Sequence, residues 1–258
     1  MRAVLASRAR IEAIVLKEGE ENEKRFGSVL AKACSRGIEV RRVGRRRASR
    51  YFDTVHSQGI GLVVVRPKEV SAAEVMREDG PVLVLDGVSD PGNCGSLIRT
   101  AVLLGFAGVI RTPGTVDFFS PKVVRSSVGA VVYLPIATAD PKEVQNEAHR
   151  SGRRVLTAVP GGKPFPRDAG DGPGEFPVLV LGGEARGVGP NWADAESISI
   201  PVRSVPEIDS LGVAAAGAIL MAWIGRKSYS RIPRVPRVRG EGRGQREKET
   251  KNGAAGGI

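Results

Sequence analysis

Short apolar runs alternate with helical patterns from residue 81 onward. The runs consist mainly of Val, Leu and Ile without regular polar alternation, which indicates strands that are buried on both faces. Helix-length segments separate these runs, and this order predicts a parallel sheet that is covered by helices on both sides. We expect strands over residues 82–85, 108–110, 131–135, 154–158 and 178–181, and helices over residues 96–104, 141–151 and 211–224.

The first part of the chain has the pattern of a second, smaller α/β unit. Apolar residues recur at helical spacing from Glu20 to Arg36, which predicts a helix. Gly37 follows at the position where a glycine commonly ends a helix. Apolar runs before and after this helix predict strands over residues 11–16, 38–43 and 59–65.

These patterns divide the chain into four segments. We expect a small α/β domain over residues 1–66, a linker with one or two helical turns over 67–79, and a larger domain over 80–229. Residues 230–258 are rich in Gly, Pro and basic residues and lack periodicity, which predicts a basic disordered tail.

The charge of the chain is strongly positive. The 258 residues carry 39 Lys and Arg against 28 Asp and Glu, a formal net charge of +11. Such a surplus favours a polyanionic partner, because Lys and Arg that neutralise phosphates release bound counterions. Plain solubility is the alternative explanation.

Several protein classes find no support in the residues. Cys34 and Cys94 lie far apart in sequence and match neither a disulfide framework nor a zinc pattern. Only two histidines are present, so no metal site is expected. The beginning of the chain lacks the apolar core of a signal peptide, and no apolar stretch has the length of a membrane span. We therefore expect a cytoplasmic protein without membrane contact.

Three glycine-containing loops follow or flank predicted strands, and each carries one or two polar residues. In an open parallel sheet, ligands bind at the carboxyl ends of the strands, so the three loops are expected to converge on one crevice. None has the Gly-x-Gly-x-x-Gly or Gly-Lys-Ser/Thr pattern of dinucleotide and phosphate loops. The common Rossmann-type methyltransferase is disfavoured for the same reason.

The first loop reads Asp-Pro-Gly-Asn-Cys-Gly and is followed by Arg-Thr-Ala. It resembles the first motif of the SpoU family, also called TrmH, of RNA ribose 2′-O-methyltransferases in the SPOUT superfamily. The resemblance places Asn93 and Arg99 in the active site. The alternative is that Asn93 caps a helix and Arg99 is a solvated surface charge.

The second loop, Leu-Gly-Gly-Glu-Ala-Arg-Gly, resembles the family motif Leu-Gly-x-Glu-Gly-x-Gly. The resemblance assigns Gly182 to the cofactor and Glu184 to the catalytic arrangement. Ala185 stands where the family usually has Gly, and Ala would be disfavoured if that position needs a positive φ.

The third loop is the weakest match to the family. The resemblance assigns Ile200 and Leu211 to the cofactor pocket and Ser210 to the catalytic group, although Ser210 would also suit a helix N-cap. Gly212 replaces the usual Asn, and Ala214 replaces a Ser. The resemblance therefore supports cofactor binding more strongly than catalysis.

The small domain carries candidate RNA-binding residues. His56-Ser57-Gln58-Gly59-Ile60 resembles the end of the RNA-binding domain that precedes the catalytic domain in many SpoU proteins. Tyr51 and Phe52 follow an arginine-rich segment, and rings beside arginines suit RNA, although both rings could be core residues. The candidate RNA-binding residues are Arg41, Arg45, Arg46, Arg47 and His56.

The resemblance implies an α/β protein with a C-terminal SPOUT domain, a parallel sheet and a trefoil knot, preceded by a small α/β RNA-binding domain. It further implies an enzyme that transfers a methyl group from S-adenosylmethionine to a ribose 2′-hydroxyl, and a homodimer. We favour structured ribosomal RNA, 23S in particular, as the substrate. The alternatives are transfer RNA, a SpoU-like RNA-binding protein that has lost catalysis, and an unrelated nucleotide-binding enzyme.

Overall fold

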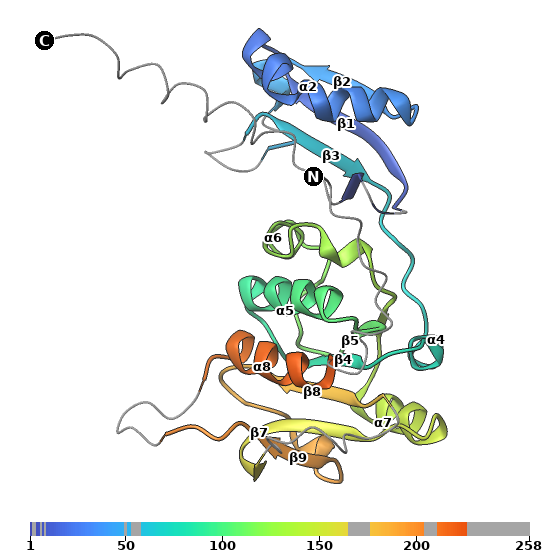
Figure 1. Cartoon of the computed structure of the whole chain (residues 1–258), viewed down its shortest axis with the longest axis vertical. Helices are drawn as coiled ribbons and strands as arrows, with labels where there is room; N and C mark the ends of the chain where they lie inside the picture. The colour runs from blue at the N-terminus through green and yellow to red at the C-terminus, as the bar shows by residue number, and fades with distance from the viewer. Residues whose placement is uncertain are drawn as a thin grey trace, which may run out of the picture.

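The structure is a computed structural model of the chain. It describes residues 1, 4–5, 7, 9–48, 51–52, 58–164, 176–203 and 211–225, except for the side chains of 20–23 and 45. Two separate β-sheets form the framework, one near the N-terminus and a larger one in the second part of the chain. Figure 1 shows the two units one above the other, joined by the segment that follows β3 (Ile60–Val64).

The N-terminal sheet has the order β2-β1-β3. β1 (Ile11–Lys17) lies in the middle, parallel to β2 (Glu39–Val43) and antiparallel to β3. α2 (Glu20–Ser35) packs its apolar side against the sheet, and the short α3 (Arg45–Ala48) follows β2. The three predicted strands and the predicted helix of this unit are thus confirmed.

Gly37 ends α2 in the predicted way. Its φ is +65°, a conformation that costs glycine little. The N–H of Gly37 donates to the carbonyl of Cys34, and the N–H of Ile38 donates to that of Ala33, both at 3.0 Å. These two bonds form the Schellman motif, which satisfies carbonyls at the helix end.

The larger sheet has six parallel strands in the order β6-β5-β4-β8-β7-β9. The chain moves from β4 outward to β6, then crosses to β7, and β8 inserts between β7 and β4. The carboxyl ends of β4 and β8 therefore lie side by side, with Asp86 in register with Gly182. The strands are β4 (Val82–Asp86), β5 (Gly108–Arg111), β6 (Ile136–Thr138), β7 (Val155–Pro164), β8 (Val178–Gly182) and β9 (Glu196–Ser199).

Helices cover both faces of this sheet, as the pattern predicted. Separate apolar cores lie on the two faces. The first core is covered by α5 (Pro91–Leu103), α6 (Pro121–Ser126), η1 (Ala130–Val132) and α8 (Val213–Gly225), and the second by α4 (Ala72–Arg77), α7 (Pro141–Arg150) and η3 (Pro190–Trp192). No helix among the described residues is long and apolar enough to cross a membrane.

The expected strand over 131–135 is wrong. Residues Ala130–Val132 form the 3-10 turn η1, and the strand begins only at Ile136. Val131 is buried in the core under α5, so this apolar run packs as a turn before the chain reaches the sheet edge. β9 and α6 were not expected, because both are short and their apolar positions give little periodic signal.

α5 begins earlier than expected and includes the first glycine loop. Asp90 is its N-cap, and Pro91 occupies the first turn. α6 crosses this turn closely, because the Ser126 hydroxyl donates to the carbonyl of Pro91 at 2.8 Å. A Cβ on Gly95 would lie 1.9 Å from Ser126 Oγ and 2.7 Å from the backbone N of Ser127. Only glycine at this position lets the two helices approach so closely.

We expect Gly95→Ala to lower the thermal midpoint of unfolding. Alanine gains about 1 kcal/mol in helix propensity, but overpacking against the α6 backbone costs roughly 1–3 kcal/mol. The control is Ser96→Ala on the exposed neighbouring position of the same helix, which should melt at or slightly above the wild type. Thermal unfolding followed by circular dichroism compares the three proteins, and a Gly95→Ala variant as stable as the wild type would contradict the packing argument.

Candidate active site

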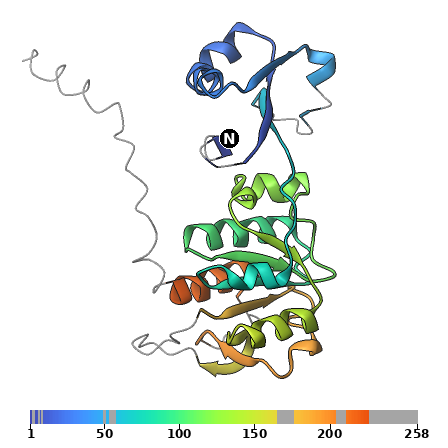
Figure 2. The same ribbon diagram turned by 90° about the vertical axis from the view of Figure 1, so that its right-hand side faces the viewer.

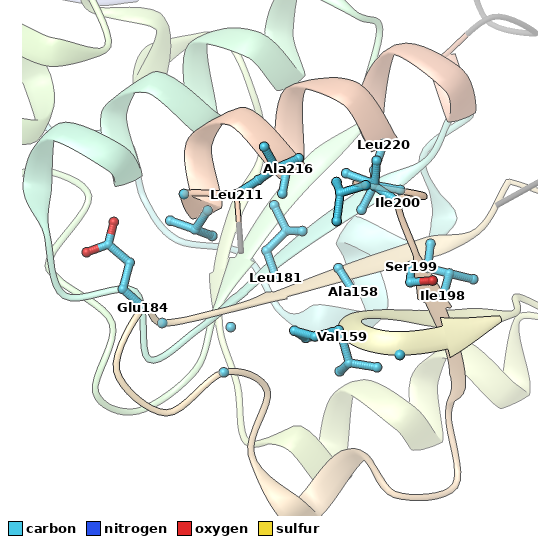
Figure 3. A pocket seen from close by; sticks show the side chains of 18 of the residues that line it. Ala158, Val159, Leu181, Glu184, Ile198, Ser199, Ile200, Leu211, Ala216 and Leu220 are labelled. Carbon is cyan, nitrogen blue, oxygen red and sulfur yellow. The ribbon is translucent and has the colours of Figure 1, made fainter. Parts of the chain in front are cut away.

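A pocket of about 690 Å³ opens beside the carboxyl end of β8. This volume is in the range of small-molecule sites. Its main walls are residues 158–161 of β7, 181–184 at the end of β8, 198–202 at the end of β9, and the beginning of α8. Figure 3 shows apolar side chains such as Leu181, Leu211 and Leu220 around the cavity, with Glu184 at one edge, apart from them.

The predicted cofactor residues all line this pocket. Gly182, Ile200 and Leu211 come from three different segments and meet there. Gly182 has no room for a side chain, because a Cβ would lie 2.0 Å from the carbonyl carbon of Gly187. A Cβ on Gly183 would lie 2.3 Å from the carbonyl oxygen of Gly87. Bare backbone therefore forms this wall, and a ligand can approach it closely.

Two of the predicted catalytic residues are in direct contact. Asn93 Nδ2 donates a hydrogen bond of 2.5 Å to Glu184 Oε1, which joins the first turn of α5 to the loop after β8. The suggested helix-capping role of Asn93 is wrong, because Asp90 Oδ1 accepts from the Asn93 backbone N–H at 2.7 Å and caps α5. The Asn93 side chain therefore contacts Glu184, which lines the pocket.

Of the other two predicted catalytic residues, Arg99 is described by the structure and is not joined to this pair. Arg99 is exposed on α5, does not line the pocket, and its side chain has no polar partner within the described part of the chain. Ser210 lies outside the described residues. Its role as a helix cap or a catalytic group therefore stays a prediction.

Ala185 causes no strain in the second loop. Val128 is the only non-glycine residue with positive φ in the described ranges, so position 185 does not require glycine. Gly187, with a φ of +62°, takes the left-handed conformation instead. The N–H of Gly187 donates to the carbonyl of Gly183 at 2.8 Å and closes the turn that carries Glu184.

The sequence analysis missed Asp86, which ties this loop to the sheet. Its Oδ2 accepts from the N–H of Gly189 at 2.9 Å, and its Oδ1 accepts from the Thr112 hydroxyl at 2.6 Å. Its backbone carbonyl accepts from the N–H of Gly183, also at 2.9 Å. An acidic residue at the end of a buried strand was the available signal. Residues 158–161 were also missed, although Pro160 and Gly161 follow a predicted strand as in the other loops.

Two further observations limit the chemistry of the site. Burial raises the pKa of the Cys94 thiol to about 12, so this cysteine stays protonated at neutral pH and is a poor nucleophile. Among the described residues, no group of three or more His, Cys, Asp or Glu side chains could hold a metal ion.

The candidate RNA-binding residues differ in their availability. Arg41 forms two hydrogen bonds with Glu39, at 3.0 and 2.9 Å, so its charge is partly neutralised. Arg46 and Arg47 are exposed, whereas His56 and the side chain of Arg45 are not described. The two rings also differ, because Tyr51 is exposed and Phe52 packs against a small apolar cluster of the N-terminal unit.

Comparison with protein families gives two matches along the chain. The SpoU rRNA Methylase family model matches residues 80–222. A model for RNA 2′-O ribose methyltransferase substrate binding matches residues 2–70.

Curated relatives match over most of their length. A 23S rRNA (adenosine(1067)-2′-O)-methyltransferase from Streptomyces laurentii is 31% identical over 208 residues, which are 80% of this chain and 76% of the relative. A 23S rRNA (guanosine(2553)-2′-O)-methyltransferase from Bacillus subtilis is 30% identical over 186 residues, 72% of each chain.

Solved structures agree with this fold. A crystal structure of an AdoMet-bound rRNA methyltransferase from Sinorhizobium meliloti has a TM-score of 0.70 at 25% identity, and covers 88% of this chain and 84% of that one. A TrmH-family structure from Porphyromonas gingivalis has a TM-score of 0.64 at 28% identity, and covers 87% and 85%.

We expect Asp86→Ala to weaken ligand binding in this pocket, with S-adenosylmethionine, the ligand named for the Sinorhizobium meliloti structure, as the probe. The loop after β8 loses its tether, and hydrogen bonds to a charged group contribute roughly 1.5–3 kcal/mol, so the dissociation constant should rise about 10- to 100-fold. Asp86→Asn is the matched control, because its oxygen can accept from Gly189 while its amide donates to Thr112. Titration calorimetry should find that variant near the wild type, and an Asp86→Ala protein with wild-type affinity would refute the tether.

Proposed function

Because the chain belongs to the SpoU rRNA methylase family, we propose that it transfers the methyl group of S-adenosylmethionine to a ribose 2′-hydroxyl of 23S ribosomal RNA. The observation that carries this proposal is the Asn93–Glu184 hydrogen bond at the mouth of a pocket lined by Gly182, Ile200 and Leu211. The curated relatives named above act on 23S ribosomal RNA, which favours ribosomal over transfer RNA.

The pocket fits S-adenosylmethionine in size and in chemistry. Its apolar walls suit an adenine ring, and Gly182 and Gly183 place no side chain between the main chain and the ligand. When bound, the cofactor supplies an activated methyl group, so no metal is required. Gly182, Ile200 and Leu211 hold it, and the Asn93–Glu184 pair orients the groups at the pocket mouth.

Arg99 acts as a donor and not as a base. A guanidinium keeps its proton in proteins, so it is a poor acceptor for the proton of the 2′-hydroxyl. It can hold the phosphate of the target nucleotide and stabilise negative charge that develops on the attacking oxygen. The predicted role of Ser210, as of Asn93 and Glu184, is to orient the reacting groups.

We also propose that the protein is a homodimer. α8 is apolar on nearly all sides, yet its side chain Ile219 is 45% exposed, and Leu103 on neighbouring α5 is 64% exposed. A second copy seated on this surface would cover both side chains and would bring Arg99, one helical turn from Leu103, to the interface. The trefoil knot remains part of the proposal, supported by the family match and by α8 packing back onto α5.

We likewise propose that the chain divides into four segments, residues 1–66, 67–79, 80–229 and 230–258. This division is supported by the separate sheets and by the two family models. The location we propose is the cytoplasm, where a ribosomal RNA substrate is available.

Label transfer tests the main proposal. Purified protein incubated with methyl-labelled S-adenosylmethionine and fractionated RNA should place label in 23S ribosomal RNA, and mapping of 2′-O-methyl sites should locate it on a ribose. Label in transfer RNA alone would support that alternative substrate. Absence of saturable cofactor binding would contradict the SpoU assignment itself.

A second candidate function is cofactor and RNA binding without transfer. Gly212 lines the pocket where the family usually has Asn, and a Cβ added there would meet nothing within 4 Å. Among the described residues, no atom therefore occupies the place where that side chain would begin. Saturable binding of S-adenosylmethionine without label transfer would favour this function.

Arg99→Ala should separate binding from chemistry. Loss of a donor to the developing charge typically costs about 10²- to 10³-fold in rate. The affinity for S-adenosylmethionine should stay within about twofold of the wild type, since Arg99 does not line the pocket. Labelled transfer and calorimetry on the same preparation test both statements, and full activity of the variant would remove Arg99 from the mechanism.

Ile219→Glu should convert the proposed dimer into a monomer. The substitution places a charge in the middle of a surface that a second copy would desolvate, at a cost that the interface cannot recover. Light scattering after gel filtration measures the mass. Tyr51→Glu, at an exposed ring of the N-terminal unit, is the control that should leave the mass unchanged, and a monomeric wild type would refute the dimer.

A further inference from the structure

The segment that forms α5 and α6 is poor in acidic residues once the N-cap Asp90 of α5 is passed. Between residues 91 and 138 the only acidic residue is Asp117, whereas the cations are Arg99, Arg111, Lys122 and Arg125. The opposite face differs, since α4 and α7 interleave Glu74, Glu143 and Glu147 with basic residues. Positive charge is therefore concentrated on one side of the sheet.

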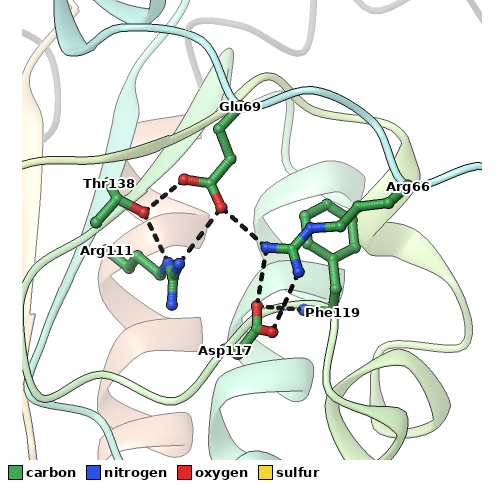
Figure 4. A network of polar contacts seen from close by, with 6 residues as sticks. All are labelled: Arg66, Glu69, Arg111, Asp117, Phe119 and Thr138. Atoms are coloured by element: carbon green, nitrogen blue, oxygen red, sulfur yellow. Dashed lines mark hydrogen bonds and ion pairs between the residues drawn. The ribbon is translucent and has the colours of Figure 1, made fainter.

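A polar network neutralises part of this charge (Figure 4). Arg66 contacts Asp117 at 3.4 Å and Glu69 at 3.1 Å, and stacks over the ring of Phe119. Glu69 also binds Arg111 at 3.3 Å. Asp117, the single acidic residue between positions 91 and 138, is thus paired with Arg66, which lies outside this segment. Arg111 is paired with Glu69. Arg99, Lys122 and Arg125 are the cations that remain.

Lys122 and Arg125 lie on the same side of α6, three residues apart. Both are exposed, and neither side chain has an ion-pair or hydrogen-bond partner within the described residues. Several other arginines of this unit are bound, for example Arg153 to four backbone carbonyls and Arg154 to Glu196. Two free cations on a helix of six residues form a local surplus of charge.

α6 is held at a fixed place beside the candidate active site. The hydroxyl of Ser126 binds the carbonyl of Pro91, and the missing side chain of Gly95 lets α6 touch the first turn of α5. The same turn presents Asn93 to Glu184. Lys122 and Arg125 therefore have a defined position relative to the pocket mouth.

α6 also faces the N-terminal unit. Figures 1 and 2 both place it between α5 and the N-terminal sheet. Arg125 lines a groove of about 610 Å³ between the two units, whose opposite wall includes Leu62 and Val64 of β3. A polyanion that contacts both the N-terminal unit and the active site would pass along α6.

We propose that Lys122 and Arg125 form a phosphate-binding surface for the RNA backbone, separate from the arginines of the N-terminal unit. The inference rests on the proposed function and deepens it, because it places part of the RNA on the catalytic unit. Each contact neutralises one phosphate and releases counterions. This surface contributes affinity and positioning of the RNA and takes no part in cofactor binding.

The test is the double variant Lys122→Gln/Arg125→Gln. Its matched control is Arg77→Gln/Lys142→Gln, which removes two exposed cations from helices on the opposite face of the sheet. Fluorescence anisotropy with a labelled RNA hairpin is recorded for both variants and the wild type over a range of salt concentrations. Calorimetry with S-adenosylmethionine and thermal unfolding are measured on the same samples.

We expect the α6 variant to reduce the slope of log affinity against log salt by roughly 1.4–1.8, and to bind on the order of 30-fold more weakly at about 0.1 M salt. The control should keep the wild-type slope, and cofactor affinity should be unchanged in both.

An unchanged slope in the α6 variant, or an equal loss in the control, would overturn the surface. Either result would leave the proposed function standing if the wild type still methylates RNA. A wild type that neither binds nor methylates RNA would instead refute the proposed function.

Discussion

The close approach of the loops that follow β4 and β8 is the constraint on which the site depends. Parallel pairing brings the ends of β4 and β8 into register, so the loops that follow them lie against each other. There is no room for side chains between these loops. Gly183 makes this close approach possible, because a Cβ there would overlap the Gly87 carbonyl of the loop after β4, and a Cβ on Gly182 would overlap Gly187 of its own loop. Asp86 then fixes the spacing by binding both Thr112 and Gly189. The pocket wall and the Asn93–Glu184 contact both follow from this junction.

Sequence patterns predicted the parts of this arrangement that depend on local chemistry. The buried strands, the end of α2 at Gly37 and the glycine loops all carry signals within a few neighbouring residues. The cofactor wall of Gly182, Ile200 and Leu211 came from a resemblance of motifs, and the structure assembles the three in one pocket.

The remaining features depend on contacts between distant segments, which a single sequence does not reveal. Val131 looked like a strand residue, but tertiary packing under α5 makes it part of a turn. Arg41 looked like a free cation, but Glu39 lies two positions away on the same face of the strand and binds it. Arg99 matched a motif, yet its exposure away from the pocket became visible only when α5 was placed.

Much of the positive charge of the chain is not available to a polyanionic partner. Solubility alone would require no particular distribution, and many cations of the chain are in fact bound to carboxylates or carbonyls. Glu69 illustrates this: burial alone would raise the pKa of its carboxyl, but Thr138, Arg111 and Arg66 lower it on balance. Glu69 is therefore ionised at neutral pH and keeps Arg66 and Arg111 occupied. Lys122 and Arg125 differ, because neither has such a partner among the described residues. The helix that carries them, α6, is held against the first turn of α5 by the Ser126–Pro91 hydrogen bond. A cation that is exposed and unpaired has lost little of its attraction for a phosphate, and this is the physical basis for placing RNA along α6.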